Sequence, residues 1–140
     1  MELSEQVVSL ELAKKMKELG FSQESLFWWF KDYYPDGYLE SGEWRIVDRR
    51  IIYQRACLFS RKDEDTEIKD GDIISAYSTA ELGEMLPSAM SLTRKTVENS
   101  WRYQDIEGNS LYADTEADAR AKMLIYLAEQ GLINPKDIKI

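Results

Sequence analysis

The sequence predicts an α+β domain in which three helices pack against a mostly antiparallel sheet of about five or six strands. Segments whose apolar residues recur at helical spacing alternate with short segments rich in β-branched and aromatic residues. Hairpin-like connections between the strand segments argue against a parallel, doubly wound sheet. The chain has 140 residues and no visible linker or repeat, so a single domain over residues 1–140 is expected.

The first elements are a β-prone segment at 6–8 and a helix with apolar residues at helical spacing over 12–19. Ser9 is the predicted N-cap of this helix, and Gly20 is its predicted C-terminal residue in the left-handed conformation. Phe21 follows directly and is expected to make the hydrophobic contact that accompanies such a helix end.

Three strands are predicted in the next part of the chain, at 26–30, 44–48 and 50–58, because bulky aromatic and β-branched residues pack well on a pleated surface. The sequence Tyr-Pro-Asp-Gly at 34–37 predicts a turn between the first two. The charged segment 61–72 has no apolar periodicity and is interpreted as a loop.

A short strand is expected at 73–77, followed by a short helix. Ser78 and Glu81 have the spacing of a capping box, in which each side chain accepts a hydrogen bond from the other residue's backbone N–H. Pro87 is expected to end this helix.

Segment 88–94 is interpreted as a loop, and two further strands are predicted at 96–104 and 111–113. The polar, glycine-containing segment 105–109 between them is typical of a hairpin connection.

The last helix has the clearest sequence pattern. Asp114 or Thr115 is its predicted cap, and Gly131 is its predicted end. Small side chains on its apolar face would let it lie close to a sheet. The residues of that face are Ala117, Ala121, Leu124, Ile125 and Ala128.

The composition argues against most catalytic chemistry. The chain has no histidine and a single cysteine, Cys57. The commonest general base and metal ligand is therefore missing, and an intrachain zinc site or disulfide is not expected. We accordingly expect a protein that is not an enzyme and has no catalytic residues, cofactor or metal. An acidic N-terminus, one cysteine and no long apolar run lead us to expect a cytoplasmic protein without membrane contact.

Charge and aromatic residues are both distributed unevenly. The net charge is −8, yet residues 44–62 carry six basic residues and one acidic residue. Ten of the 16 aromatic residues lie within 27–59. Since aromatic residues and arginine are enriched at binding surfaces, this region is the candidate binding surface. Its members are Trp28, Trp29, Tyr33, Tyr34, Trp44, Arg45, Arg49, Arg50, Tyr53 and Arg55.

Several functions are compatible with this region. The aromatic residues could form a protein-binding or self-associating patch, which includes a homodimer, or they could belong to the core. The basic, aromatic strands at 44–62 would suit an accessory protein that binds nucleic acid through stacking and phosphate contacts. The strong overall acidity also fits a DNA mimic that inhibits a host protein.

The segments 75–87 and 113–127, followed by 131–133, resemble a family of small prophage-type, phage-related proteins of gut and other bacteria. The opening helix at 12–15 and the segment 24–29 add to the resemblance. It implies an origin in a mobile element and carries no catalytic residues with it. The function we expect from all these observations is a non-catalytic protein-interaction module of prophage type.

Overall fold

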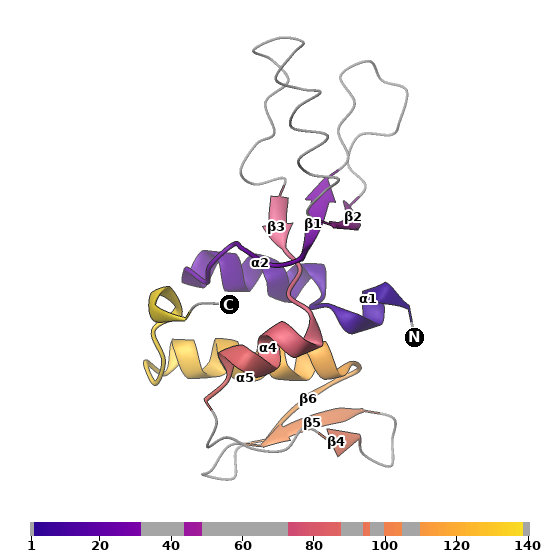
Figure 1. Cartoon of the computed structure of the whole chain (residues 1–140). Helices are drawn as coiled ribbons and strands as arrows, with labels where there is room; N and C mark the ends of the chain where they lie inside the picture. The colour runs from indigo at the N-terminus through magenta and orange to yellow at the C-terminus, as the bar shows by residue number, and fades with distance from the viewer. Residues whose placement is uncertain are drawn as a thin grey trace, which may run out of the picture.

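The computed structural model describes residues 2–31, 44–48, 73–87, 94–95, 100–104 and 110–138. These residues form an α+β structure with antiparallel strands (Figure 1). The helices are α1 (Leu3–Gln6), α2 (Leu10–Leu19), α4 (Thr79–Met85), α5 (Glu116–Glu129) and the 3₁₀ helix η3 (Pro135–Asp137). The strands are β1 (Phe27–Lys31), β2 (Trp44–Asp48), β3 (Ile73–Ser75), β4 (Arg94–Lys95), β5 (Trp101–Gln104) and β6 (Ser110–Ala113).

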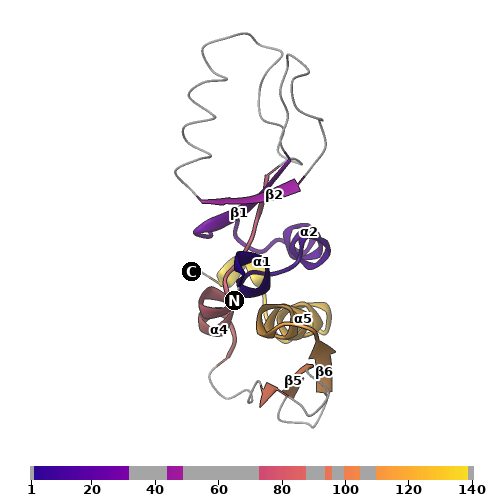
Figure 2. The same ribbon diagram turned by 90° about the vertical axis from the view of Figure 1, so that its right-hand side faces the viewer.

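The strands do not form the single sheet that we expected. Those of the described residues form two three-stranded sheets, ordered β2-β1-β3 and β4-β5-β6. The helices lie between the two sheets, which occupy opposite ends of the described structure (Figures 1 and 2). Strand patterns in a sequence identify strands but not their partners. The division of the strands into two sheets could therefore not be predicted from the sequence.

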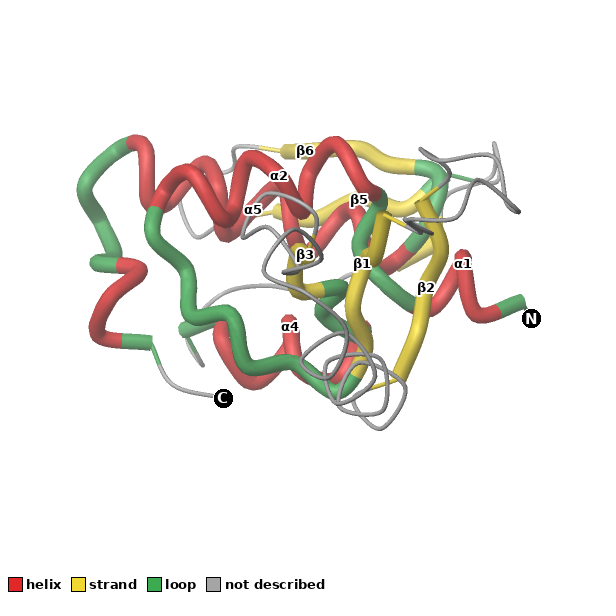
Figure 3. The backbone as a smooth tube through the Cα atoms, turned by 90° about the horizontal axis from the view of Figure 1, so that it is seen from above, coloured by secondary structure: helices red, strands yellow, loops and turns green. Residues whose placement is uncertain are grey.

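In the first sheet β1 is the central strand and pairs with both neighbours in antiparallel fashion. Viewed from above, β2 lies on one side of β1 and β3 on the other (Figure 3). Trp29 pairs with Ile46 of β2 and with Ile74 of β3. Directly opposite residues lie on the same face of a sheet, so this register decides which side chains meet the helices.

The second sheet is a β5–β6 hairpin extended by the two-residue strand β4. Gln104 pairs with Ser110 across the predicted hairpin connection, and Trp101 pairs with Ala113. The antiparallel pairing of the two predicted strands is therefore confirmed, whereas 96–99 of the first strand and the connection at 105–109 lie outside the described residues. Strand β4 corrects a prediction, because Arg94 was expected to lie in a loop and instead pairs with Arg102 of β5.

Helix α5 lies at the centre of the structure. It contacts α2 and α4 on one side and β5 and β6 on the other. The helix does lie against a sheet, as expected, but its buried residues are not confined to one stripe. Those residues are Ala117, Ala119, Ala121, Met123, Leu124, Ile125 and Leu127. A helix covered from several directions loses the simple amphipathic pattern of a surface helix.

The predicted ends of α2, α4 and α5 are confirmed in position, although the Ser9 side chain at the start of α2 makes no capping hydrogen bond. Gly20 follows α2 with φ of 95°, in the left-handed region that glycine adopts without strain. Phe21 packs in the core directly after it, with 3% of its surface exposed. The capping box of Ser78 and Glu81 opens α4, and Thr115, rather than Asp114, caps α5 by accepting a hydrogen bond from the Asp118 N–H at 3.1 Å.

Two helical turns were not predicted. The four-residue helix α1 takes in Gln6, the first residue of the β-prone segment at 6–8. Within that segment Val7 makes a β-bridge to Ser78. Near the other end of the chain, η3 begins at Pro135, where Asn134 caps it. Helix α1 lies next to a bridge with a distant residue, and η3 depends on a single cap. Neither feature gives the periodic apolar pattern by which longer helices are predicted.

The predicted turn at 34–37, the strand at 50–58 and the loop at 61–72 lie outside the described residues.

Candidate functional site

The first sheet divides the tryptophans of the candidate binding surface between its two faces. Trp28 and Trp29 are adjacent in β1, and neighbouring strand residues point to opposite faces. Trp29 packs against the hydrophobic core, as does Trp44 of β2. The alternation of side chains along a strand requires Trp28 and Trp29 to separate, and the structure shows that Trp29 is the one that faces the core.

Trp29 and Trp44 belong to the face that meets the helices. The indole Nε1 of Trp29 donates a hydrogen bond to the backbone oxygen of Val8 at 2.9 Å, so the sheet is tied to the segment before α2. The Lys14 ammonium of α2 lies 5.2 Å from the centre of the Trp44 ring, within cation–π range. Both tryptophans therefore have structural roles.

Trp28 and Arg45 lie on the opposite face, which we call the outer face of the first sheet. The strand register assigns six described residues to it: Trp28, Phe30, Arg45, Val47, Ile73 and Ser75. Phe30 and Ser75 are buried, whereas Arg45 is exposed. The accessible part of this face is therefore on its β2 side.

Trp28 differs from Trp29 in its polar atom as well. Its indole Nε1 is shielded from solvent and has no acceptor among the described residues. A buried tryptophan N–H usually finds a partner, and leaving it without one costs free energy. On this face, the Trp28 indole is thus an aromatic group with a hydrogen-bond donor that no described residue satisfies.

The remaining members of the candidate binding surface are outside the described residues. They are Tyr33, Tyr34, Arg49, Arg50, Tyr53 and Arg55. Cys57 also lies there.

Glu81 is the buried acidic residue of the described structure, with 6% of its surface exposed. One carboxylate oxygen accepts from the Ser78 N–H at 3.0 Å, as the capping box requires. The other accepts from the Leu26 N–H at 3.3 Å, just before β1. The sequence predicted the cap but gave no signal for the second bond, which joins α4 to the first sheet.

Tyr77 joins β3 to the segment after α2. It is fully buried, and its hydroxyl donates to the Ser22 carbonyl and accepts from the Gln23 amide at 3.3 Å. Burial raises the pKa of the Tyr77 phenol well above its usual value, so this group stays protonated. A protonated phenol held by backbone and amide partners is a structural group rather than a proton donor or acceptor for chemistry.

Asp118, in the first turn of α5, accepts a hydrogen bond from the Ser9 N–H at 2.7 Å. Partial burial raises the pKa of the Asp118 carboxyl, and the bond from Ser9 offsets part of that effect. This contact connects the start of α2 to the start of α5.

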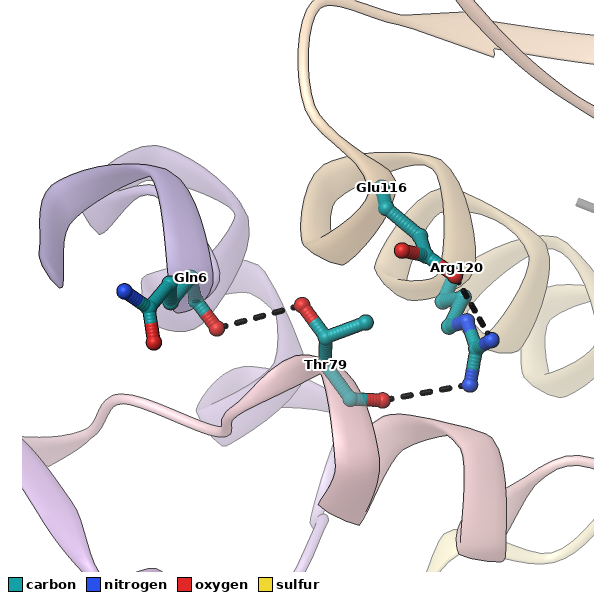
Figure 4. Close-up of polar contacts among 4 residues, drawn as sticks. All are labelled: Gln6, Thr79, Glu116 and Arg120. Atoms are coloured by element: carbon teal, nitrogen blue, oxygen red, sulfur yellow. Dashed lines mark hydrogen bonds and ion pairs between the residues drawn. The ribbon is translucent and has the colours of Figure 1, made fainter. Parts of the chain in front are cut away.

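Arg120 forms a second junction between helices (Figure 4). Its guanidinium donates to the Thr79 carbonyl at 3.2 Å and to the Glu116 carboxylate at 2.8 Å. The Thr79 hydroxyl in turn donates to the Gln6 carbonyl at 3.2 Å. The chain of contacts runs from α1 through α4 to α5, and it uses charged groups to fix helix positions.

Within the described ranges, no three histidine, cysteine, aspartate or glutamate residues gather where they could hold a metal ion. No described helix is long and apolar enough to cross a membrane. Comparison with known proteins found no matching protein family, no similar curated protein and no similar solved structure.

Proposed function

We propose that this chain is a non-catalytic protein-interaction module, and that its binding surface includes the β2 side of the outer face of the first sheet. The observation that supports this choice is the separation of the tryptophans. Trp29 and Trp44 are used in the core, whereas Trp28 lies on the same face as the exposed Arg45. Tryptophan and arginine are the residue types most enriched among the residues that dominate binding energy.

A non-catalytic role agrees with how the chain uses its polar residues. It has no histidine. Glu81, Tyr77 and Asp118 each connect two parts of the fold through bonds to backbone groups. The printed bonds of these three side chains hold parts of the fold together, which supports a non-catalytic role.

A second candidate function is binding of nucleic acid through the basic, aromatic segment 44–62. The exposed position of Arg45 on the same face as Trp28 favours it, because stacking and phosphate contacts need this combination. The net charge of −8 opposes it at long range. We therefore rank a protein partner first.

Site-specific photo-crosslinking tests the proposal. A photoreactive amino acid at position 45 is expected to crosslink to a protein when the chain is expressed in its native host. The same amino acid at position 132 is the control, because Leu132 is 62% exposed and follows α5 in the chain, outside the strands of the first sheet. Trp28→Ala in the position-45 background should reduce the crosslink yield, with a thermal melt showing that the variant is folded.

The products distinguish the alternatives. A crosslink to a second copy of this chain would identify a homodimer, which is one form of the proposed function. Nucleic acid as the sole product at position 45 would support the second candidate and overturn the first. Equal protein yields from positions 45 and 132 would remove this face from consideration.

A further inference from the structure

One peptide group, between Val8 and Ser9, connects the first sheet to helix α5. Its carbonyl oxygen accepts a hydrogen bond from the Trp29 indole Nε1 at 2.9 Å. Its N–H donates to the Asp118 carboxylate at 2.7 Å. The peptide bond is trans, so the carbonyl and the N–H point in opposite directions and reach their partners on opposite sides. Trp29, the peptide group and Asp118 therefore form one continuous chain of hydrogen bonds.

The surroundings of this peptide group favour coupling between its two hydrogen bonds. Val8 is fully buried, and its own N–H donates to the Tyr77 carbonyl at 2.9 Å, which fixes the segment in place. In a shielded environment, linked hydrogen bonds polarise one another, and each is strengthened by roughly 10–30%. A bond to a charged acceptor is also stronger than a bond to a neutral one. The charge of Asp118 thus acts on the Val8 carbonyl oxygen.

We propose that the Asp118 carboxylate controls the hydrogen bond that anchors β1, acting through the peptide group between Val8 and Ser9. The ionised carboxylate polarises this group and makes the Val8 oxygen a better acceptor for the Trp29 indole. Protonation removes the charge and weakens the anchor. Asp118 is a positioning residue in this role, and acid is the signal to which it responds.

The position of Asp118 makes it responsive to mild acid. Burial raises the pKa of its carboxyl, and the hydrogen bonds from Ser9 offset part of this effect. Among the described residues, the charged groups that act on it are Lys122, which lowers the pKa, and Asp114, which raises it. Asp118 therefore takes up a proton at a higher pH than an exposed aspartate does. Its ionisation costs overall stability through burial, yet it strengthens the local bond between Trp29 and Val8.

The anchor acts on the central strand of the first sheet. Trp29 pairs with Ile46 of β2 and with Ile74 of β3, so a change in its hydrogen bond acts on the strand that joins both neighbours. Trp28, the preceding residue, lies on the outer face of this sheet. An effect of acid on binding at that face rests on the proposed function, whereas the chain of hydrogen bonds does not.

Indole ¹H–¹⁵N NMR spectra of the full chain test the proposal, with Trp29→Phe identifying the Trp29 signal by its loss. Asp118→Asn keeps an oxygen for the Ser9 N–H but removes the charge. At pH 7 this variant should therefore show the Trp29 indole proton shifted upfield, as expected for a weakened hydrogen bond. Lowering the pH from 7 to 4 should move the wild-type signal in the same direction and leave the signal of Asp118→Asn in place.

Asp114→Asn is the matched control, because Asp114 is exposed and the Ser9 N–H donates to Asp118 instead. Its Trp29 signal should still respond to pH, at a slightly lower pH than in the wild type. The Trp28 indole, which has no acceptor among the described residues, should not follow the titration.

Two outcomes would overturn the proposal. One is an equal Trp29 shift in the wild type and Asp118→Asn at pH 7, and the other is a pH response of Trp29 that persists in Asp118→Asn. Thermal melts verify that each variant is folded. The spectra do not involve a partner, so this proposal and the crosslinking result at position 45 can fail independently.

Discussion

The Glu81 carboxylate accepts the backbone N–H of Leu26, a residue 55 positions earlier in the chain, at 3.3 Å. The same carboxylate caps its own helix through the Ser78 N–H. One buried acidic side chain therefore satisfies two backbone donors from different elements and links the entry of the first sheet to α4.

Glu81→Ala is expected to destabilise the protein by about 2–4 kcal/mol, because it removes a cap and leaves the Ser78 and Leu26 N–H groups without their acceptor. Urea unfolding followed by circular dichroism measures this change. Glu84→Ala in the same helix is the control, since Glu84 is exposed, and it should alter the free energy of unfolding by less than about 0.5 kcal/mol. Similar losses in both variants would mean that the Leu26 contact contributes nothing.

The effect of Gly83→Ala on stability should depend on the residue at position 120 and have opposite signs in two backgrounds. In an ordinary helix interior this change stabilises by about 1 kcal/mol. Here the added methyl group would overlap the Arg120 guanidinium, which Thr79 and Glu116 hold in place. We expect Gly83→Ala to destabilise the wild type and to stabilise the Arg120→Ala variant, as a double-mutant cycle by urea unfolding would show. The same sign in both backgrounds would contradict the expected overlap.

The indole N–H groups of Trp28 and Trp29 allow a direct comparison of stability, because one has a hydrogen-bond acceptor and the other has none among the described residues. Trp29→Phe removes the hydrogen bond to Val8 and leaves that carbonyl unsatisfied, so a loss of about 1–3 kcal/mol is expected. Trp28→Phe removes an N–H that has no acceptor among the described residues, and it should cost clearly less. Thermal unfolding of the two variants compares them directly, and an equal or larger loss for Trp28→Phe would refute this assignment.

Asp118 should make a pH-dependent contribution to stability. Burial raises its folded-state pKa above the unfolded value of 3.8, so the folded state binds more protons between these two pKa values. Its contribution is therefore fully present below pH 3.8 and decreases as the pH rises through the folded-state pKa. Relative to Asp118→Asn, which cannot titrate, the wild type should lose stability over this range. Unfolding both proteins from pH 3 to pH 7 tests this sign, and a relative gain in stability with rising pH would contradict it.

Local patterns in the sequence were sufficient for most of the individual elements. The α2 helix and its Gly20 end, the capping box at Ser78 and the β5–β6 hairpin each depend on residues a few positions apart. Their physical causes are backbone conformation, capping bonds and turn geometry, which neighbouring residues set.

The candidate binding surface was predicted less well. The sequence identified an aromatic and basic region, and the alternation of side chains along a strand separates Trp28 from Trp29. Only the structure showed that Trp29 is the one that packs against the core. The sequence also gave no signal for which residues stand opposite one another in the second sheet, such as Arg102 and Tyr112. Pairs of residues on neighbouring strands can be identified only when the register of the strands is known.

The sequence by itself determined that the chain forms an α+β structure, where its main helices begin and end, and that it lacks histidine. Only the tertiary structure decided that the described strands form two sheets with the helices between them, and which side of each sheet faces outward. The reason is that strand pairing and helix packing depend on contacts between residues far apart in the chain. Glu81 and Leu26 meet because the sheet and α4 bring them together, and no local pattern records that contact.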